Sequence, residues 1–238
     1  MGKKVSHEWL WCMGPPPVAG LEDGLFVNAV RLRLGASHAA EPQLCQQRDG
    51  LLDPTAYHAS CCPPGASTEG HNDVRDALLD LAKIADATSE PEVLGLSASA
   101  PDVRPADILT SALSGNVSHA LNVGIAAPLA INAGPDCTEA MRKRKVGRYA
   151  RWQGELSEQH ISYRPLVWSS WGREHADTTA ALSELAKVAS RPRGLADFRP
   201  LLARARRGIG LAIVRRAARM VLSCQAWLGQ RQQALLGV

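Results

Sequence analysis

Apolar residues change their spacing in a fixed order between residues 67 and 190, and this order constrains the fold more than any other feature of the chain. Residues 68–87 carry apolar side chains three and four apart, which predicts a helix capped by Ser67 or Thr68. The segments that follow are three strand-like apolar runs, a strongly basic helix, a fourth strand and an Ala/Leu helix: 92–97, 105–109, 119–127, 139–158, 163–169 and 178–190. The order α-β-β-β-α-β, followed by helices, predicts an α/β fold.

The regions on either side of this series differ from it in composition. Residues 1–66 are punctuated by Pro and Gly and contain one short amphipathic stretch, at 25–34. Residues 197–228 have a helical pattern with six arginines: Arg204, Arg206, Arg207, Arg215, Arg216 and Arg219. The sequence therefore predicts a loop-rich N-terminal region (1–66), an α/β core (67–190) and a basic helical C-terminal region (191–238).

The charge is divided unevenly along the chain. Residues 1–139 hold 8 Lys and Arg against 17 Asp and Glu, whereas residues 140–238 hold 19 against 6. Such asymmetry indicates a polyanionic partner for the basic half, and nucleic acid is the partner we expect. The densest cluster is Arg142, Lys143, Arg144, Lys145, Arg148 and Arg151. Two interpretations remain open for this cluster: contact with phosphate, or a solvated helix face. Two also remain open for the C-terminal arginines: contact with phosphate, or packing by the stems of their side chains.

Bulk features exclude several classes of protein. No apolar window is long enough for a transmembrane helix, and the first residues lack the apolar region of a secretory signal, so we expect a chain that is neither membrane-spanning nor secreted. Six cysteines in 238 residues do not make a disulfide framework. We therefore expect a reducing compartment, the cytoplasm or the nucleus.

One set of residues carries chemistry. Asp107 begins the second predicted strand, Asn122 lies in the third, and adjacent strands can bring the two together at one end of a sheet. Lys145 and Tyr149 are four apart on the next helix and so share a face. Metal-dependent nucleases need such a set, because carboxylates hold Mg²⁺ against the scissile phosphate and a lysine orients water. The alternatives are a turn aspartate, a cross-strand asparagine and a solvated helix face.

Several short motifs occur in an order typical of one family. They are Val30–Gly35, the set Cys45/His58/Cys62, His71-Asn72 with Arg75-Asp76, Arg104-Pro105-Ala106-Asp107, Leu121-Asn122-Val123, Lys145 with Tyr149, Arg164–Val167, and Trp171-Gly172. In these motifs residues 25–224 resemble the C-terminal region of non-LTR retrotransposon polyproteins, where a Cys/His knuckle precedes a restriction-like endonuclease of the PD-(D/E)XK type.

The resemblance implies a fold, an activity and a set of roles. It implies a restriction-endonuclease-like αβββαβ core that cleaves target DNA with Mg²⁺, and a nuclear location. Asp107 would hold the metal, Asn122 would occupy the position of the second ligand, and Lys145 would orient water or phosphate. Tyr149 would support the helix face, and Glu92 would be an accessory acid. The resemblance also implies that Cys45, His58 and Cys62 bind zinc.

The departures from the family pattern affect both metal sites. Asn122 replaces the family's second acid, so the charge that holds a hard cation is reduced. Arg48 replaces the second knuckle cysteine, which leaves three zinc ligands where a structural site needs four, and His71 or His38 could fill the gap only by distortion. We therefore expect a weak nuclease or none. The alternatives are a non-catalytic nucleic-acid-binding module and a structural or interaction protein.

Overall fold

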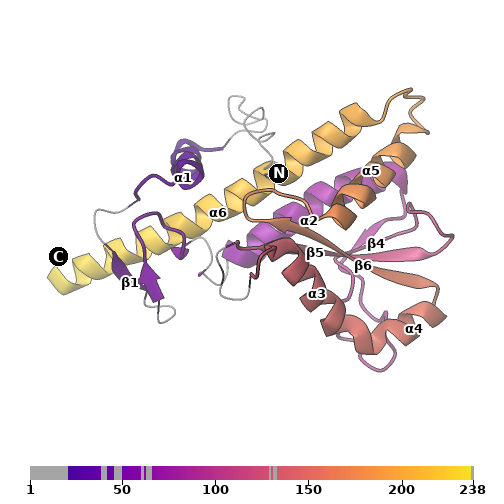
Figure 1. Ribbon diagram of the computed structural model, residues 1–238, viewed down its shortest axis with the longest axis horizontal. Helices are drawn as coiled ribbons and strands as arrows, with labels where there is room; N and C mark the ends of the chain where they lie inside the picture. Colours follow the sequence, from indigo (N-terminus) through magenta and orange to yellow (C-terminus); the bar gives the residue numbers. More distant parts are fainter. Residues whose placement is uncertain are drawn as a thin grey trace.

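The computed structural model describes residues 21–38, 42–45, 50–59, 62, 66–128, 130 and 133–236. Figure 1 shows how the elements are arranged. In chain order they are α1 (Asp23–Leu34), β1 (Gln43–Cys45), β2 (Gly50–Leu52), α2 (Ala66–Ala85), β3 (Glu90–Pro91), β4 (Ile108–Thr110), β5 (Ser118–Ala126), α3 (Cys137–Tyr149), α4 (Gln153–Glu158), β6 (Ile161–Ser169), α5 (Ala176–Ser190) and α6 (Arg199–Leu236). The predicted α/β class is confirmed.

The main sheet has four strands in the order β3-β4-β5-β6. β4 runs antiparallel to both β3 and β5, and β6 runs parallel to β5 after the crossover through α3 and α4. Ile108 pairs with Leu121 and Asn122 pairs with Pro165, which fixes the register of β5 between its two neighbours. From α2 to β6 the elements therefore follow the expected α-β-β-β-α-β order in one mixed sheet.

The two faces of the sheet are covered by different helices (Figure 1). Leu121 and Val123 of β5 face the main core, which α2, α5 and α6 complete. The alternate residues Ala120 and Ala126 pack in smaller clusters on the other face, with Leu156 of α4 and Cys137 of α3. The strand is buried on both sides, which explains why its sequence is apolar at nearly every position.

Helix α6 belongs to the main core. Its residues Ile209 and Ile213 are buried there beside residues of α2 and α5. Polar side chains add to the packing: Arg206 is paired with Glu174 at 2.9 Å and Arg219 with Asp73 at 3.0 Å. Two of the six C-terminal arginines are thus held by carboxylates of the protein itself, which favours the packing interpretation for them. Within the described ranges, no helix combines the length and the apolarity needed to cross a bilayer.

Three expectations about the elements differ from the structure. The first strand is Glu90–Pro91 and not 92–97, because Pro91 cannot donate to a ladder and Glu92 has a positive φ of 52° that turns the chain away. The basic helix does not run unbroken to residue 158: a 3₁₀ turn at Ala150–Trp152 separates α3 from α4. The N-terminal region, expected to be loop apart from one helix, also contains the antiparallel pair β1 and β2.

Candidate functional site

Asp107 lies where β4 and β5 diverge. Its backbone N–H donates to the carbonyl oxygen of Leu121 at 2.8 Å, next to the last paired residues of the two strands. Its carboxylate oxygen Oδ2 then accepts the N–H of Val123 at 2.6 Å. The side chain thus satisfies a backbone donor that the end of the ladder leaves without a strand partner. Asp107 therefore acts as a residue that starts a strand, which is one of the interpretations that the sequence left open.

His71 of α2 reaches the same carboxylate. Its Nε2 lies 3.2 Å from Oδ1 of Asp107; the side chain of His71 is 33% exposed and that of Asp107 is 17% exposed. The sequence pointed to His71 as the start of the first helix and as a distorted fourth zinc ligand, and not as a partner of Asp107. Both oxygens of Asp107 are therefore engaged, one by an imidazole and one by a backbone amide.

Lys145 of α3 meets Asn122 of β5. The ammonium group of Lys145 donates to Oδ1 of Asn122, whose residue is 4% exposed. Gly124 permits this approach, because a Cβ atom there would lie 2.6 Å from Cε of Lys145 and 3.2 Å from Cγ of Met141. Burial lowers the pKa of Lys145 to about 8, although the negative charge of Asp107 acts in the opposite direction. The predicted convergence of Asp107, Asn122 and Lys145 is thus present in the structure.

Tyr149 ties α3 to the segment that leads into Asp107. Its hydroxyl donates to the carbonyl oxygen of Arg104 at 3.0 Å, and its ring is buried against the rings of Tyr163 and Trp152. Burial raises the pKa of the Tyr149 hydroxyl, so it remains a neutral donor. Tyr149 therefore anchors the end of α3 to this segment, and the role in a nuclease site that the resemblance implies stays a prediction.

Glu92 lies beside Asp107 through the backbone. Its N–H donates to the carbonyl oxygen of Asp107 at 3.0 Å. Its carboxylate is paired with the guanidinium groups of Arg75 and Arg104, the latter at 3.2 Å. The predicted accessory acid is close to the site, but two arginines neutralise its charge.

The residues at this site do not fit Mg²⁺. A hard cation prefers several carboxylate oxygens, and the only carboxylate that converges on Asn122 and Lys145 in the described part of the chain is Asp107. The oxygen of Asn122 already accepts from Lys145, and the guanidinium group of Arg75 adds positive charge nearby. Among the residues that the structure describes, no three His, Cys, Asp or Glu side chains gather to hold a metal ion. We derive no step through magnesium.

The predicted zinc ligands lie near the far end of α6. Cys62 is buried in a cluster with Val221 and Cys224, and Nε2 of His58 is buried without a hydrogen-bond partner in the described part of the chain. The backbone of Cys45 belongs to β1, but its side chain lies outside the described residues. His71 lies at Asp107, whereas His38 is hydrogen-bonded through Nδ1 to Asn28 at 3.0 Å and through its backbone N–H to Pro54. Zinc binding stays a prediction.

The basic cluster on α3 divides into two groups. Arg142 pairs with Asp177 at 2.5 Å, and Lys143 lies 3.7 Å from Glu139. The other group is exposed and has no ion pair within the described ranges: Arg144, Arg148 and Arg151. Arg144 and Arg148 are four apart on α3, and Arg151 lies in the 3₁₀ turn that follows it; we refer to these three residues as the arginine stripe. Arg151 lies 3.9 Å from the centroid of Trp152.

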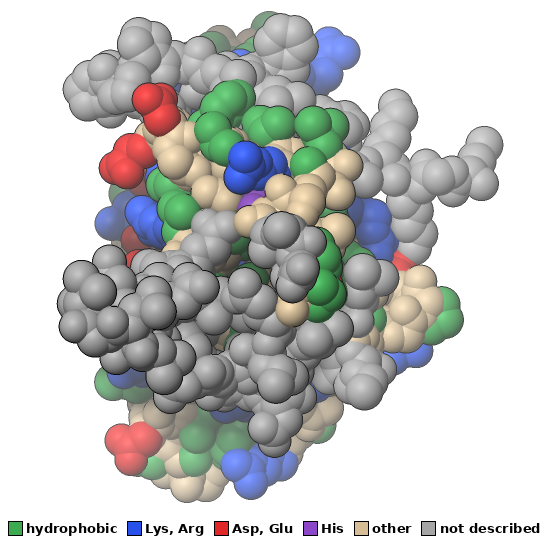
Figure 2. Space-filling model, turned by 90° about the vertical axis from the view of Figure 1, so that its left-hand side faces the viewer, with side chains coloured by type: hydrophobic (Ala, Val, Ile, Leu, Met, Phe, Trp, Pro, Cys, Tyr) green, Lys and Arg blue, Asp and Glu red, His purple; other side chains and the backbone are tan. Residues whose placement is uncertain are grey.

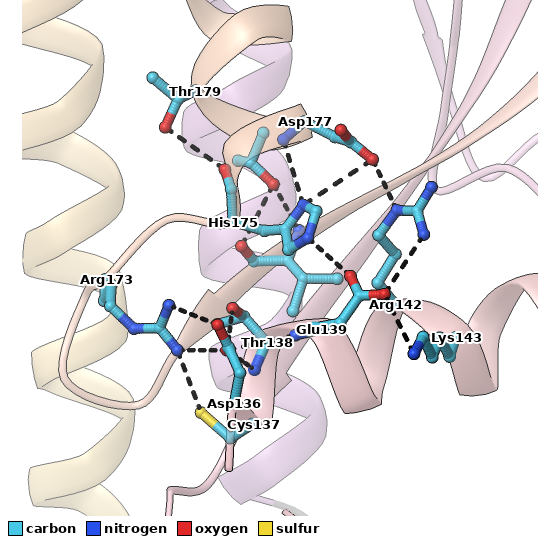
Figure 3. Close-up of polar contacts among 12 residues, drawn as sticks. Asp136, Cys137, Thr138, Glu139, Arg142, Lys143, Arg173, His175, Asp177 and Thr179 are labelled. Carbon is cyan, nitrogen blue, oxygen red and sulfur yellow. Dashed lines mark hydrogen bonds and ion pairs between the residues drawn. The ribbon is translucent and has the colours of Figure 1, made fainter. Parts of the chain in front are cut away.

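A polar network fixes the beginning of α3 (Figure 3). Asp136 caps the helix by accepting the N–H of Thr138 at 3.0 Å, and it binds Arg173 of the β6–α5 turn at 2.5 Å. His175 caps α5: its Nδ1 accepts the N–H of Asp177 at 3.1 Å, so Nε2 carries the proton donated to Glu139 at 2.8 Å. The network joins the two helices to the end of β6 and so determines where Lys145 reaches the sheet.

This network lay outside the predicted site. The helical spacing of Glu139 from Arg142 and Lys143 is visible in the sequence and could have indicated their pairing. The contributions of Arg173 and His175 depend on the packing of the β6–α5 turn against α3.

No protein-family model, curated protein sequence or solved structure matches this chain.

Proposed function

We propose that this chain binds the phosphate backbone of nucleic acid through the arginine stripe of α3. We further propose that its core is that of a restriction-like endonuclease whose Mg²⁺-dependent cleavage is weak or lost. One observation carries the proposal: α3 and the 3₁₀ turn after it present three exposed arginines without ion pairs in the described part of the chain, and α3 also places Lys145 against Asn122 and close to Asp107. The stripe faces solvent, whereas Lys145, about 100° from Arg144 around the helix, faces the sheet.

The proposal of a PD-(D/E)XK scaffold rests on topology and on the position of the polar residues. The αβββαβ order, the mixed sheet and the place of Asp107 at the divergence of β4 and β5 all support it. With the sequence motifs, they also support an origin in the C-terminal region of a non-LTR retrotransposon polyprotein. DNA is then the proposed partner and the nucleus the proposed compartment.

The loss of cleavage follows from the charges at the site. One carboxylate remains, and Asn122 replaces the second. Three cationic side chains contribute to the surroundings of Asp107 or Glu92: Lys145, Arg75 and Arg104. These cations are balanced by the carboxylates of Asp76, Glu92 and Asp107, so little negative charge is left to hold a divalent cation.

Salt-dependent binding tests the proposal. Affinity for a fluorescent DNA duplex is measured by anisotropy over a range of salt concentrations, for the full chain and for the triple variant Arg144→Ala/Arg148→Ala/Arg151→Ala. If each arginine contacts one phosphate, the log–log salt slope of the variant falls by roughly 2.7. The matched control is Arg193→Ala/Arg204→Ala/Arg207→Ala, which removes three exposed charges elsewhere.

The control distinguishes the stripe from general positive charge. We expect the control variant to keep most of the slope. Equal losses in the two triple variants would show that net charge and not the stripe attracts DNA. Absence of binding at low salt would favour the alternative, a structural or interaction protein that keeps only the scaffold.

A further inference from the structure

Positive charge alone does not single out a binding surface on this protein. Figure 2 shows Lys and Arg side chains on several sides of one end of the molecule, the end at the left of Figure 1, whereas α4 lies toward the other end. The three residues of the arginine stripe also carry the same charge as one another. What distinguishes them is the contact that each guanidinium group makes with the protein.

The guanidinium groups of the stripe differ in their contacts with aromatic rings. The guanidinium carbon of Arg151 lies over the ring of Trp152, 3.9 Å from its centroid. That of Arg148 is farther from a ring, at 5.7 Å from the centroid of Tyr149. Within the described ranges Arg144 has no such contact. Arg151 is therefore the member of the stripe that lies closest to an aromatic face.

Trp152 is a fixed part of the structure. It ends the 3₁₀ turn Ala150–Trp152 between α3 and α4, and it is only 6% exposed. Its ring packs against that of Tyr149, with the two centroids 5.7 Å apart. Arg151, in contrast, is an exposed residue. The buried indole thus provides a surface that holds an exposed guanidinium group in one place.

A ring contact of this kind leaves the hydrogen-bond donors of Arg151 available. The N–H groups of a guanidinium lie in its own plane, so a ring that covers one face does not block them. They can form two parallel hydrogen bonds to the two non-bridging oxygens of a phosphodiester. An arginine that is held in place before the ligand arrives also loses less conformational entropy on binding. A lysine supplies a point charge without this planar fork of donors.

We propose that Trp152 is a positioning residue for phosphate recognition: it orients the guanidinium group of Arg151, which then binds one backbone phosphate through two hydrogen bonds. The inference rests on the proposed function and deepens it, because it assigns to Arg151 a phosphodiester group with two free oxygens as its ligand. Trp152 is buried and acts through Arg151. Arg144, which has no ring contact in the described part of the chain, contributes through its charge.

The experiment is a double-mutant cycle with a fluorescent DNA duplex. Anisotropy gives the affinities of the full chain, of Trp152→Leu, of Arg151→Ala and of the variant with both changes. We expect Trp152→Leu to bind roughly 3- to 10-fold more weakly, the range that corresponds to ordering one arginine side chain, with an unchanged salt slope because no charge is removed. Once Arg151 has been replaced, the same change should have no effect on affinity.

A second pair of variants decides the question if Trp152→Leu does not fold, as judged by circular dichroism. Arg151→Lys and Arg144→Lys both keep the charge and leave Trp152 in place. We expect Arg151→Lys to bind roughly 5- to 10-fold more weakly, because lysine cannot form the two parallel hydrogen bonds, and Arg144→Lys to stay within about twofold of the unaltered chain. Both should keep the salt slope.

The possible failures are distinguishable. A merely structural role of Trp152 would weaken binding equally with and without Arg151, and this result would overturn the positioning role while leaving backbone binding by the stripe intact. Equal losses in the two lysine variants would have the same meaning. Absence of DNA binding by the unaltered chain at low salt would overturn the proposed function and the positioning role together.

Discussion

Lys145 donates to Asn122 across the space that Gly124 leaves open between α3 and β5. The contact brings an ammonium group and an amide oxygen together on a buried part of the sheet, close to the carboxylate of Asp107. In this arrangement the amide oxygen is the acceptor for the lysine, and it does not add the negative charge that a divalent cation requires. Under the proposed function, Asn122 occupies the position of an acidic ligand, and this difference accounts for the expected loss of hydrolysis.

Introducing an acid at position 122 tests whether the rest of the proposed nuclease site is intact. Asn122→Asp places a second carboxylate between Lys145 and Asp107, and we expect nicking of supercoiled plasmid with Mg²⁺ or Mn²⁺ to rise at least tenfold above the unaltered chain. Binding of Mn²⁺, followed by electron paramagnetic resonance, provides a readout that does not require turnover. The isosteric exchange adds a charge with little change of volume, so folding should be retained.

The control for this gain is Asn122→Asp combined with Asp107→Ala, which removes the first carboxylate and should abolish both signals. Retained nicking in the double variant would indicate a contaminating nuclease. A folded Asn122→Asp variant with neither metal binding nor nicking would show that more of the site has been lost than one charge.

Gly124→Ala tests the close approach of α3 to the sheet. The added methyl group would lie 2.6 Å from Cε of Lys145 and 3.2 Å from Cγ of Met141, so the lysine must move away from Asn122. We expect a loss of about 1–3 kcal/mol in the free energy of unfolding, measured with urea. Gly147→Ala is the matched control on α3, because nothing lies within 4 Å of the position of its Cβ. It should gain about 0.5–1 kcal/mol, since alanine favours a helix interior. Equal effects at the two positions would contradict the packing described for Lys145.

The sequence was sufficient to predict those features of the site that depend on the order of helices and strands along the chain. Asp107 and Asn122 belong to adjacent strands, and Lys145 belongs to the helix that follows, so element order alone brings the three together. The pairing of His71 with Asp107 could not be predicted in the same way. It depends on how α2 lies across the sheet, which apolar spacing does not determine.

The charges on α3 show the same division. Glu139 lies three residues before Arg142 and four before Lys143, so helical spacing predicts that Glu139 pairs with these two residues. Asp177, however, comes from α5, and its contact with Arg142 depends on the packing of two helices. A count from the sequence therefore overstates the number of cations available to nucleic acid. In the part of this cluster that the structure describes, the residues that are exposed and have no ion pair are those of the arginine stripe.

The pairing of Arg173 with Asp136 predicts a role for the polar network of Figure 3 in holding α3. Arg173→Ala removes the 2.5 Å pair and leaves the capping carboxylate of Asp136 without its countercharge. Because both side chains are mostly buried, we expect a loss of about 1–3 kcal/mol in the free energy of unfolding. Arg199→Ala removes a more exposed arginine that pairs with Asp197, and its stability should hardly change. The same loss in both variants would contradict the network's structural role.

Lys145 predicts a specific dependence of stability on pH. Its pKa is lowered to about 8 in the folded chain and returns to its ordinary value of 10.5 on unfolding. Between these two pH values the unfolded chain binds more protons than the folded chain. The contribution of Lys145 therefore makes the free energy of unfolding rise with pH from about 8, and this rise ends near pH 10.5. The comparison is the difference in unfolding free energy between the unaltered chain and Lys145→Met, which cancels the titration of other groups. We expect the difference to shift in favour of the unaltered chain by about 2 kcal/mol between pH 7 and pH 9.5. Lys143→Met, at an exposed position of the same helix, is the control for the loss of a lysine charge. A difference that stays constant with pH would mean that Lys145 is solvated, and its contact with Asn122 would then not be the buried one described.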